Sequence, residues 1–320
     1  MPSEFDLIAR HFTRPTPMTV LGPGDDCALI QPTPGKQLAV TTDMLVSGTH
    51  FLPQTDPERL GWKALAVNLS DLAAMGAQPR WATLAGSLPE ANEDWIASFS
   101  RGFFDCASVF SVDIIGGDTT RGPLNLCVTA IGEVEPGRAL CRHGAQAGDD
   151  IWVSGQPGLA ALGLAHVQAR TQLPEPWPHL CQRALEQPQP RVALGLGLVG
   201  IASAAIDISD GLLADLGHIA ERSHLQAMIY LTRFPHQPKG VDRILALDCL
   251  LAGGDDYELC FTAPVRQRST IAALAARLEL PLWRIGEMTA AAEGEAGKVS
   301  VLDAGGQPLS FLHRGFDHFG

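Results

Sequence analysis

Aspartates placed beside glycine, serine or threonine are the residues of this sequence best suited to chemistry. They occur at separate places along the chain: Asp25-Asp26, Asp43, Asp118, Asp207, Asp210 and Asp255-Asp256. Glycine lets a backbone approach a ligand closely. Carboxylates in such places suit Mg²⁺, which takes oxygen ligands and bridges to phosphate oxygens. The pattern therefore predicts a site where several Mg²⁺ ions hold phosphate groups.

Taken one at a time, most of these aspartates are also explained as turn residues or helix caps. Asp71 is different, because it lies on a predicted helix one turn after Asn68. A charge on this largely apolar helix is expensive to bury unless it is paired or bound to a metal. The prediction of a metal site therefore depends on the combination of motifs.

Other phosphate-binding and nucleophilic motifs are absent or out of context. Residues 195–200 match G-x-G-x-x-G, but no strand is predicted before them, which disfavours a dinucleotide fold. The sequence contains neither a P-loop motif nor a G-x-S-x-G motif.

The composition indicates a folded protein with a sizeable core. The 320 residues are 46% hydrophobic and 18% charged, which is enough for one large or two moderate domains. The net charge is −12 and the Lys and Arg residues are dispersed, which disfavours nucleic-acid binding. The seven cysteines form no C-x-x-C pair and are expected to be reduced thiols. We expect a cytoplasmic protein without a membrane segment, since no apolar stretch reaches roughly 18 residues.

Strands and helices are predicted to alternate along the chain, which favours an α/β or α+β fold. The predicted strands are 37–42 (ending at Asp43), 112–115 (ending at the Gly116-Gly117-Asp118 turn), 126–134, 150–153, 204–208 and 257–262. The predicted helices are 57–75, 93–109, 159–168, 180–186, one from Arg191, 210–222 and 271–278. The segment Glu135-Pro136-Gly137 resembles a linker, so we predict domains at 1–136 and 137–320.

The ordered set of motifs resembles the thiamine-monophosphate kinase family. The motifs are GDDCA (24–28), TTDMLVSGTHF (41–51), GWKALAVNLSD (61–71), GGD (116–118), DISDGL (207–212), GGDDYE (253–258) and GFDHF (315–319). The resemblance extends from about residue 5 to residue 319. Each motif is weak alone, and the combination is highly specific.

The resemblance implies a two-domain, aminoimidazole-ribonucleotide synthetase-like architecture of α/β (α+β) class. The first domain binds ATP and Mg²⁺ and forms a homodimer through its sheet, and the second is an α/β domain. The implied reaction uses ATP to phosphorylate thiamine phosphate to thiamine diphosphate, the final step of thiamine diphosphate biosynthesis. Nucleic acid and membranes are not implied partners.

The resemblance also assigns roles to individual positions. The implied Mg²⁺ ligands are Asp26, Thr41, Thr42, Asp43, Asp71, Asp118, Asp207 and Asp210. The implied ATP contacts are Gly117, Asp118, Arg142 and Ser209, and the implied thiamine-phosphate contacts are His50, Asp255 and Phe316. These residue types fit, because a guanidinium binds phosphate in a bidentate manner and an aromatic ring stacks on a cationic thiazolium.

Several points stay open at this stage. Lys63 is either a phosphate contact or a solvated helix lysine, and Asp25 and Asp256 receive no role. Asp255 stands where many relatives have Glu. No catalytic side chain is assigned, because direct in-line transfer to an anionic phosphate oxygen needs neither a strong base nor a protein nucleophile. The alternatives are another ATP-dependent synthetase of the superfamily and a non-catalytic protein that binds thiamine phosphate or nucleotide.

Overall fold

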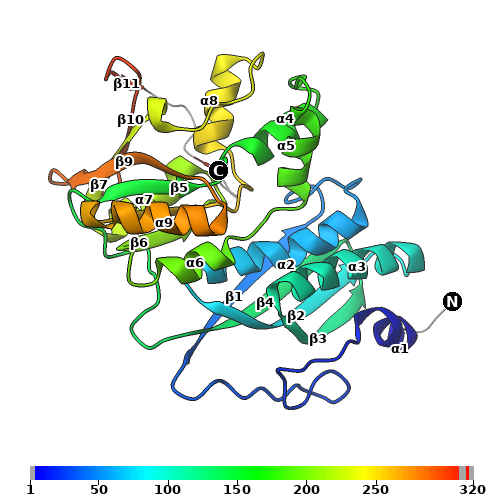
Figure 1. Cartoon of the computed structure of the whole chain (residues 1–320). Helices are drawn as coiled ribbons and strands as arrows, with labels where there is room; N and C mark the ends of the chain where they lie inside the picture. Colours follow the sequence, from blue (N-terminus) through cyan, green and yellow to red (C-terminus); the bar gives the residue numbers. More distant parts are fainter. Residues whose placement is uncertain (1–3, 310–314, 317–320) are drawn as a thin grey trace. The chain divides into compact units, whose positions relative to one another are not determined.

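The computed structural model describes residues 4–309 together with Gly315 and Phe316, and only the backbone of Glu4 and Phe5. The chain divides into two compact units, which are described separately (Figure 1). The first contains the residues up to Leu72 and Ala77–Gly137, and the second contains Ala73–Gly76 and the residues from Arg138 onwards.

The first unit is built on a four-stranded sheet with the strand order β1-β4-β2-β3. The strands are β1 (Gln37–Val46), β2 (Gln78–Leu88), β3 (Asp113–Arg121) and β4 (Asn125–Val134). β4 is antiparallel to β1 and β2, and β2 is parallel to β3. β1 and β3 are therefore the two edges of this sheet.

Two long helices, α2 (Pro57–Ala74) and α3 (Glu93–Phe110), cover one face of the sheet (Figure 1). They cross closely at two glycines. A Cβ on Gly61 would lie 2.0 Å from the carbonyl oxygen of Phe99, and one on Gly102 would lie 1.7 Å from that of Glu58. Only glycine permits this approach. The crossing fixes the position of α2, which carries Asn68 and Asp71 above β1.

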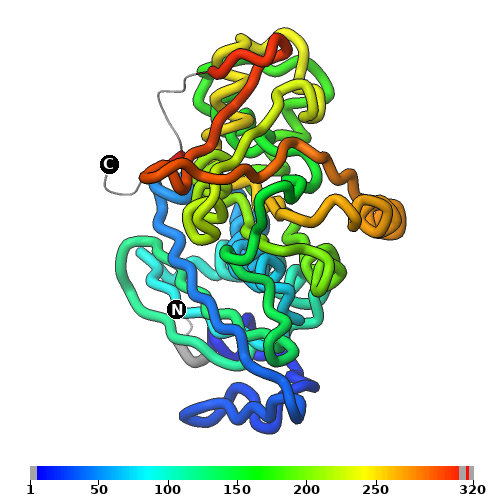
Figure 2. Tube along the Cα trace, turned by 90° about the vertical axis from the view of Figure 1, so that its left-hand side faces the viewer, coloured from blue at the N-terminus to red at the C-terminus, as the bar shows by residue number. Residues whose placement is uncertain are grey.

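An irregular segment leads from α1 (Glu4–Leu7) and the π-helix η1 (Ile8–Phe12) to β1, as Figure 2 shows in blue. Two buried carboxylates anchor it. Asp113 accepts hydrogen bonds from the Met18 N–H and the Thr19 hydroxyl, and Glu133 accepts from Thr33. The segment between these anchors contains Asp25 and Asp26.

The second unit contains a seven-stranded sheet with the order β11-β10-β7-β9-β5-β8-β6, in which only β10 and β7 pair in parallel. The strands are β5 (Asp150–Ser154), β6 (Ala204–Asp207), β7 (Leu225–Tyr230), β8 (Leu259–Ala263), β9 (Leu282–Ala290), β10 (Val299–Leu302) and β11 (Pro308–Leu309). Its main core packs α7 against the sheet through residues such as Ile206, Leu216 and Ile229.

The helices of the second unit are α4 (Leu159–Val167), α5 (Trp177–Glu186), α6 (Val192–Leu198), α7 (Leu212–Arg222), α8 (Arg243–Ala252) and α9 (Arg268–Leu278), with 3₁₀ turns η2 (Leu231–Arg233) and η3 (Val265–Gln267). Within the described residues, no helix is long and apolar enough to cross a membrane.

The predicted α/β (α+β) class is confirmed, and two predicted strand ends are wrong. β1 continues through Asp43 to Val46, and β3 continues through Gly116-Gly117-Asp118 to Arg121. Both aspartates therefore lie inside strands. The pairing of β3 with β2 shifts its register between Ala82 and Thr83. After this shift, Gly116 and Gly117 still pair with residues of β2. The predicted helix 210–222 begins two residues later, at Leu212.

The helix crossing generates a stability prediction. Gly102→Ala should lower the free energy of unfolding by about 1–3 kcal/mol, because the added methyl group forces α2 and α3 apart. Gly217→Ala in α7 is the matched control: the added Cβ would lie 3.5 Å from its nearest neighbour, the Gly297 carbonyl oxygen, and helix propensity predicts a gain of up to ~1 kcal/mol. Urea unfolding measures both, and a Gly102→Ala variant as stable as the parent would contradict the packing argument.

Candidate functional site

In the first unit, Thr41, Asp43 and Asp71 come together between β1 and α2. The Thr41 hydroxyl donates to Asp71 Oδ2 at 2.5 Å. The Asp43 N–H donates to the side-chain oxygen of Asn68 at 3.0 Å, and Asn68 is itself held by the Ala64 carbonyl. The odd-numbered residues of this part of β1 face α2, so the strand's alternation places Thr41 and Asp43 on the same face.

Burial and the neighbouring charge of Asp71 together raise the pKa of Asp43 to about 7. Two carboxylates in a partly buried space repel each other, and the cheapest relief is a proton or a cation. This geometry therefore favours binding of a positive ion beside Asp43 and Asp71.

The donor set fits Mg²⁺ in number and kind. No group of three or more His, Cys, Asp or Glu side chains suited to a metal occurs within the described part of the chain. Mg²⁺ does not need one, since it is commonly bound by one or two carboxylates together with waters and substrate phosphates. Thr42 faces the other side of the sheet, where its hydroxyl hydrogen-bonds to Thr129 at 2.8 Å.

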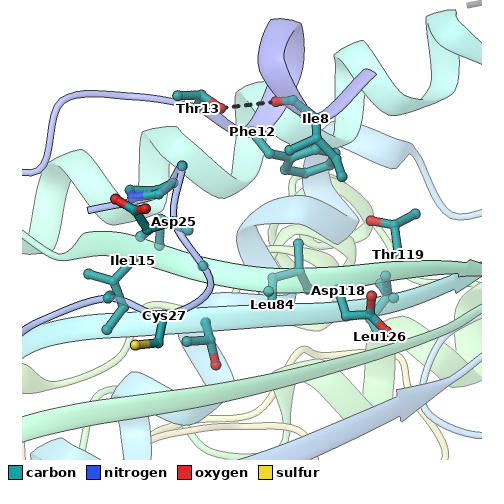
Figure 3. Close-up of a pocket in the computed structure, with 18 of the residues that line it drawn as sticks. Ile8, Phe12, Thr13, Asp25, Cys27, Leu84, Ile115, Asp118, Thr119 and Leu126 are labelled. Carbon is teal, nitrogen blue, oxygen red and sulfur yellow. Dashed lines mark hydrogen bonds between the residues drawn. The ribbon is translucent and has the colours of Figure 1, made fainter. Parts of the chain in front are cut away.

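A cavity of about 450 Å³ brings two other predicted ligands together (Figure 3). Asp26, from the anchored segment, and Gly117 and Asp118, from β3, line the same space. A Cβ on Gly117 would lie 1.8 Å from the Leu84 carbonyl oxygen, so β2 and β3 approach closely only because this residue is glycine. The cavity thus has carboxylates and accessible backbone at one side.

The rest of the cavity wall is apolar and aromatic. Figure 3 shows Ile8 and Phe12 on one side and Leu84 and Leu126 on the other. Trp95 and Phe99 of α3 also line it, and their rings stack with centroids 5.3 Å apart. A flat heterocycle joined to phosphates suits such a lining, because the apolar wall covers the ring while the polar side meets the phosphates.

Asp43 and Asp118 lie at opposite edges of the sheet. Asp43 pairs with Val128, Val128 with Leu84, and Leu84 with Gly117. Three strand spacings separate the outer positions by about 14 Å. Aspartate side chains are too short to share one Mg²⁺ across that span, since its oxygen ligands lie at roughly 2.1 Å.

His50 is oriented by backbone contacts. Its Nδ1 accepts a hydrogen bond from the Val46 N–H at 3.0 Å. Lys63 donates to the His50 carbonyl at 3.4 Å and is only 1% exposed. The alternative of a solvated helix lysine is therefore wrong for Lys63.

In the second unit, the turn between β6 and α7 gathers five predicted site residues. Asp207 ends β6, and Ser209 and Asp210 form the turn. The Ser209 carbonyl accepts from the Asp255 N–H and the Asp210 carbonyl accepts from the Phe316 N–H, both at 2.9 Å. Residues 317–319 of the predicted C-terminal motif lie outside the described residues.

Asp255 is held in a rare backbone conformation, with φ of +67°. The Tyr257 hydroxyl donates to its carboxylate at 3.1 Å. A non-glycine residue in this region is strained, and such strain is concentrated at functional sites. The strained backbone therefore supports a functional role for Asp255, in contrast to the neighbouring Asp256.

The structure gives Asp256 a structural role. Its carboxylate accepts the Gly158 N–H at 2.6 Å and that of Ala160 at 3.4 Å, at the start of α4. Its burial raises its pKa well above the ordinary value. Asp256 thus stabilises the first turn of α4.

Arg142 is exposed in the loop before β5. The neighbouring Cys141 carbonyl accepts a hydrogen bond from the Ala205 N–H at 3.0 Å, which ties this loop to β6. The loop therefore runs beside the strand that ends at Asp207.

Sequence reasoning missed Asp215 on α7. Its Oδ2 accepts the N–H groups of Ser209, Asp210 and Gly211 at 3.1, 3.2 and 3.1 Å. Burial and the charge of Asp210 raise its pKa to about 7, although these three hydrogen bonds act to lower it. The available signal was an acid at an apolar position, three residues after Leu212 and four before Ile219.

Comparisons with known proteins first define the class. The N-terminal domain model of AIR synthase related proteins matches residues 24–134, and the C-terminal domain model matches residues 146–298. The chain thus has the two-domain AIR synthase related architecture.

Full-length relatives identify the family within this class. The thiamine-monophosphate kinase of Escherichia coli (strain K12) is 46% identical over 99% of this chain and 98% of its own length. The crystal structure of thiamine-monophosphate kinase from Stenotrophomonas maltophilia K279a matches with a TM-score of 0.84 and 50% identity, over 92% of this chain and 94% of that chain. A structure of AaThiL complexed with AMPPCP and TMP has a TM-score of 0.77 and 30% identity, over 92% and 91%. The chain belongs to the thiamine-monophosphate kinase family.

The Asp43–Asp71 pair generates a pH prediction for the metal-free protein. Because the pKa of Asp43 is raised from 3.8 to about 7, its contribution to stability is full below pH ~4 and is lost as the pH rises to ~7. Asp43→Asn should therefore match the parent near pH 4 and exceed it at pH 8. The gain is at most about 4 kcal/mol, since each tenfold step of proton affinity is worth roughly 1.4 kcal/mol.

Thermal unfolding in EDTA across this pH range measures the effect. Adding Mg²⁺ at pH 8 should stabilise the parent more than Asp43→Asn. A stability difference between the two proteins that stays constant from pH 4 to pH 8 would refute the proposed repulsion.

Proposed function

We propose that this protein is a thiamine-phosphate kinase, which transfers the γ-phosphoryl group of ATP to thiamine phosphate and forms thiamine diphosphate. The main observation behind this proposal is the full-length similarity to thiamine-monophosphate kinases. The related AaThiL complex with AMPPCP and TMP supports the same pair of substrates. The reaction is the final step of thiamine diphosphate formation.

The first unit is proposed to bind ATP and Mg²⁺. The cavity with its aromatic wall accommodates the nucleotide base, and Gly117 and Asp118 lie at its phosphate side. Asp26, Thr41, Asp43, Asp71 and Asp118 are the proposed ligands, and Thr42 would contribute its backbone carbonyl oxygen, because its hydroxyl faces the other side of the sheet. Bound Mg²⁺ supplies charge neutralisation between carboxylates and phosphates.

The second unit is proposed to supply further Mg²⁺ ligands and substrate contacts. Asp207 and Asp210 are further Mg²⁺ ligands, and Ser209 and Arg142 contact ATP. Asp255 and Phe316 are proposed contacts of thiamine phosphate, and so is His50. Phe316 is 52% exposed, so its ring is accessible for stacking on a cationic heterocycle.

The proposed chemistry is direct in-line transfer. The attacking phosphate oxygen of thiamine phosphate is already anionic near neutral pH, so no general base is assigned. The residues named above hold two anionic groups in line, and the fixed carboxylates and guanidinium position the charges. No protein nucleophile takes part.

A homodimer is proposed, formed through the sheets of the first unit. β1 and β3 are edge strands, and pairing β1 of one copy with β3 of a second copy would close an eight-stranded barrel without free edges. Leu38, Val40 and Met44 leave exposed apolar side chains on β1, which such a barrel would cover. The pairing would also bring the β1 edge that carries Asp43 of one copy beside the β3 edge that carries Asp118 of the other, which one copy alone does not do.

The enzyme is proposed to act in the cytoplasm. All seven cysteines are free, as expected in a reducing compartment. Its use of ATP fits the same location.

Incubation with ATP, Mg²⁺ and thiamine phosphate tests the function. We expect equal amounts of thiamine diphosphate and ADP, resolved by chromatography. Asp118→Asn should lower turnover at least ~100-fold while changing unfolding little, because an exposed metal ligand contributes more to charge stabilisation than to packing. Tight binding of thiamine phosphate without product would favour a non-catalytic binding protein, and ADP formation coupled to another acceptor would favour a synthetase.

Mixing two inactive variants tests the shared site. If each site takes Asp43 from one copy and Asp118 from the other, an Asp43→Asn/Asp118→Asn mixed dimer has one intact site. Random reassortment should then restore about a quarter of the parent activity, because half the dimers are mixed and each has one working site of two. Mixed dimers that form, as shown by differently tagged copies, and remain inactive would place both aspartates in one copy's site.

A further inference from the structure

The turn at residues 208–211 uses almost its whole backbone in hydrogen bonds. Ile208 exchanges hydrogen bonds with Glu258 and Tyr257, and the Ser209 and Asp210 carbonyls accept from Asp255 and Phe316. The Gly211 carbonyl accepts from the Asp215 N–H. The path of this turn therefore also sets where the backbones of Asp255 and Phe316 lie.

The three remaining N–H groups of the turn share a single acceptor. Those of Ser209, Asp210 and Gly211 all point at Asp215 Oδ2, at 3.1 to 3.2 Å. Asp215 is 2% exposed, and within the described part of the chain no ion pair involves it. These N–H groups are therefore the stabilising partners of its carboxylate.

Packing leaves little freedom around this arrangement. A Cβ on Gly211 would lie 2.8 Å from the carbonyl carbon of Ala252, and one on Gly254 would lie 2.3 Å from the Ser209 carbonyl oxygen. The turn is thus pressed between the end of α8 and the segment that contains Asp255. One oxygen that collects three N–H groups fixes the direction in which Ser209 and Asp210 present their side chains.

If Asp215 served only to cap α7, a buried carboxylate would be an energetically unfavourable residue for that role. Asp215 lies close enough to Asp210 for their charges to interact, and like charges repel in a buried setting. The arrangement is understandable if the position of Asp210 matters for function, because a fixed carboxylate is ready to meet a cation without rearrangement.

We propose that Asp215 is a positioning residue for the phosphoryl transfer: its carboxylate oxygen holds the turn that presents Ser209 and Asp210, and through the turn's carbonyls it places Asp255 and Phe316. The proposal rests on the proposed function, because the roles of those four residues belong to it. It adds a residue that touches neither substrate nor metal and acts through hydrogen bonds to the backbone.

Two substitutions separate hydrogen bonding from charge. Asp215→Ala removes the acceptor, and Asp215→Asn keeps an acceptor oxygen at the same reach without the charge. We expect Asp215→Ala to weaken the binding of Mn²⁺, used as a paramagnetic probe for Mg²⁺, by about 10–100-fold. The concentration of Mg²⁺ for half-maximal activity and the dissociation constant for thiamine phosphate should rise in parallel, while Asp215→Asn should stay within about threefold of the parent.

Asp149→Ala is the matched control in the same unit. Asp149 is also a buried carboxylate, and it accepts from the Gln146 N–H at 2.9 Å and the Ser203 hydroxyl at 2.6 Å, neither of which belongs to a proposed site residue. Its loss should lower the melting temperature and leave Mn²⁺ affinity unchanged. Should Asp215→Ala not fold, Asp215→Glu replaces it, because the longer side chain displaces the carboxylate and predicts the same loss.

The outcomes are distinct. A folded Asp215→Ala with parental affinity for Mn²⁺ and thiamine phosphate would overturn the proposal, and so would an Asp215→Asn variant as impaired as Asp215→Ala, since charge would then be the property that matters. Failure of the parent protein to form thiamine diphosphate would instead count against the proposed function. Parental activity in Asp210→Asn at limiting Mg²⁺ would count against the role of the turn.

Discussion

Repulsion between neighbouring carboxylates is the constraint that the rest of the structure has to accommodate. Asp43 lies beside Asp71, and Asp210 lies close to Asp215, and each pair is at least partly buried. At low local dielectric such pairs are costly unless protons, cations or hydrogen-bond donors offset them. The donors are neutral: a threonine hydroxyl for Asp71 and backbone N–H groups for Asp215. Neutral donors orient both carboxylates: they leave the charge of Asp71 available for a cation, and they let Asp215 hold the turn that carries Asp210.

Orienting donors are useful only if the elements that carry them do not move. Asn68 and Asp71 belong to α2, whose position over β1 depends on the close crossing with α3 at Gly61 and Gly102. The turn after β6 depends in the same way on close contacts at Gly211 and Gly254. The glycines that matter most for the site therefore act through packing, by letting backbones approach so closely that the hydrogen bonds are held in one geometry.

This distinction explains how much could be predicted from the sequence. The long amphipathic helices were predicted to within one or two residues, since their apolar positions repeat at helical spacing. Glycine beside aspartate was interpreted as a turn, which is right for Asp210 but wrong for Asp118, where the glycines keep β3 close to β2. β2 and β9 were missed because Pro79, Gly86 and Gly286 and the mixed burial of their side chains hide the alternation. β7 alternates in burial, but Met228 and Tyr230 make its less buried face apolar too, so the sequence does not show the alternation. Asp215 was missed because its partners are backbone groups: the sequence shows an acid at an apolar helix position but not what that acid binds.

The spacing of the aspartates across the first sheet adds a last consequence of the same constraint. Within one copy, Asp43 and Asp118 stay about 14 Å apart, three strand spacings, so a single chain folds with only part of its acidic cluster assembled. In the proposed dimer the remaining carboxylates approach across the paired edges, where cations and phosphates offset their repulsion. Metal binding and subunit pairing would then stabilise each other, because each lowers the cost of the other. In that dimer, an acidic protein that binds an anionic nucleotide would avoid accumulating its full site charge before its ligands are present.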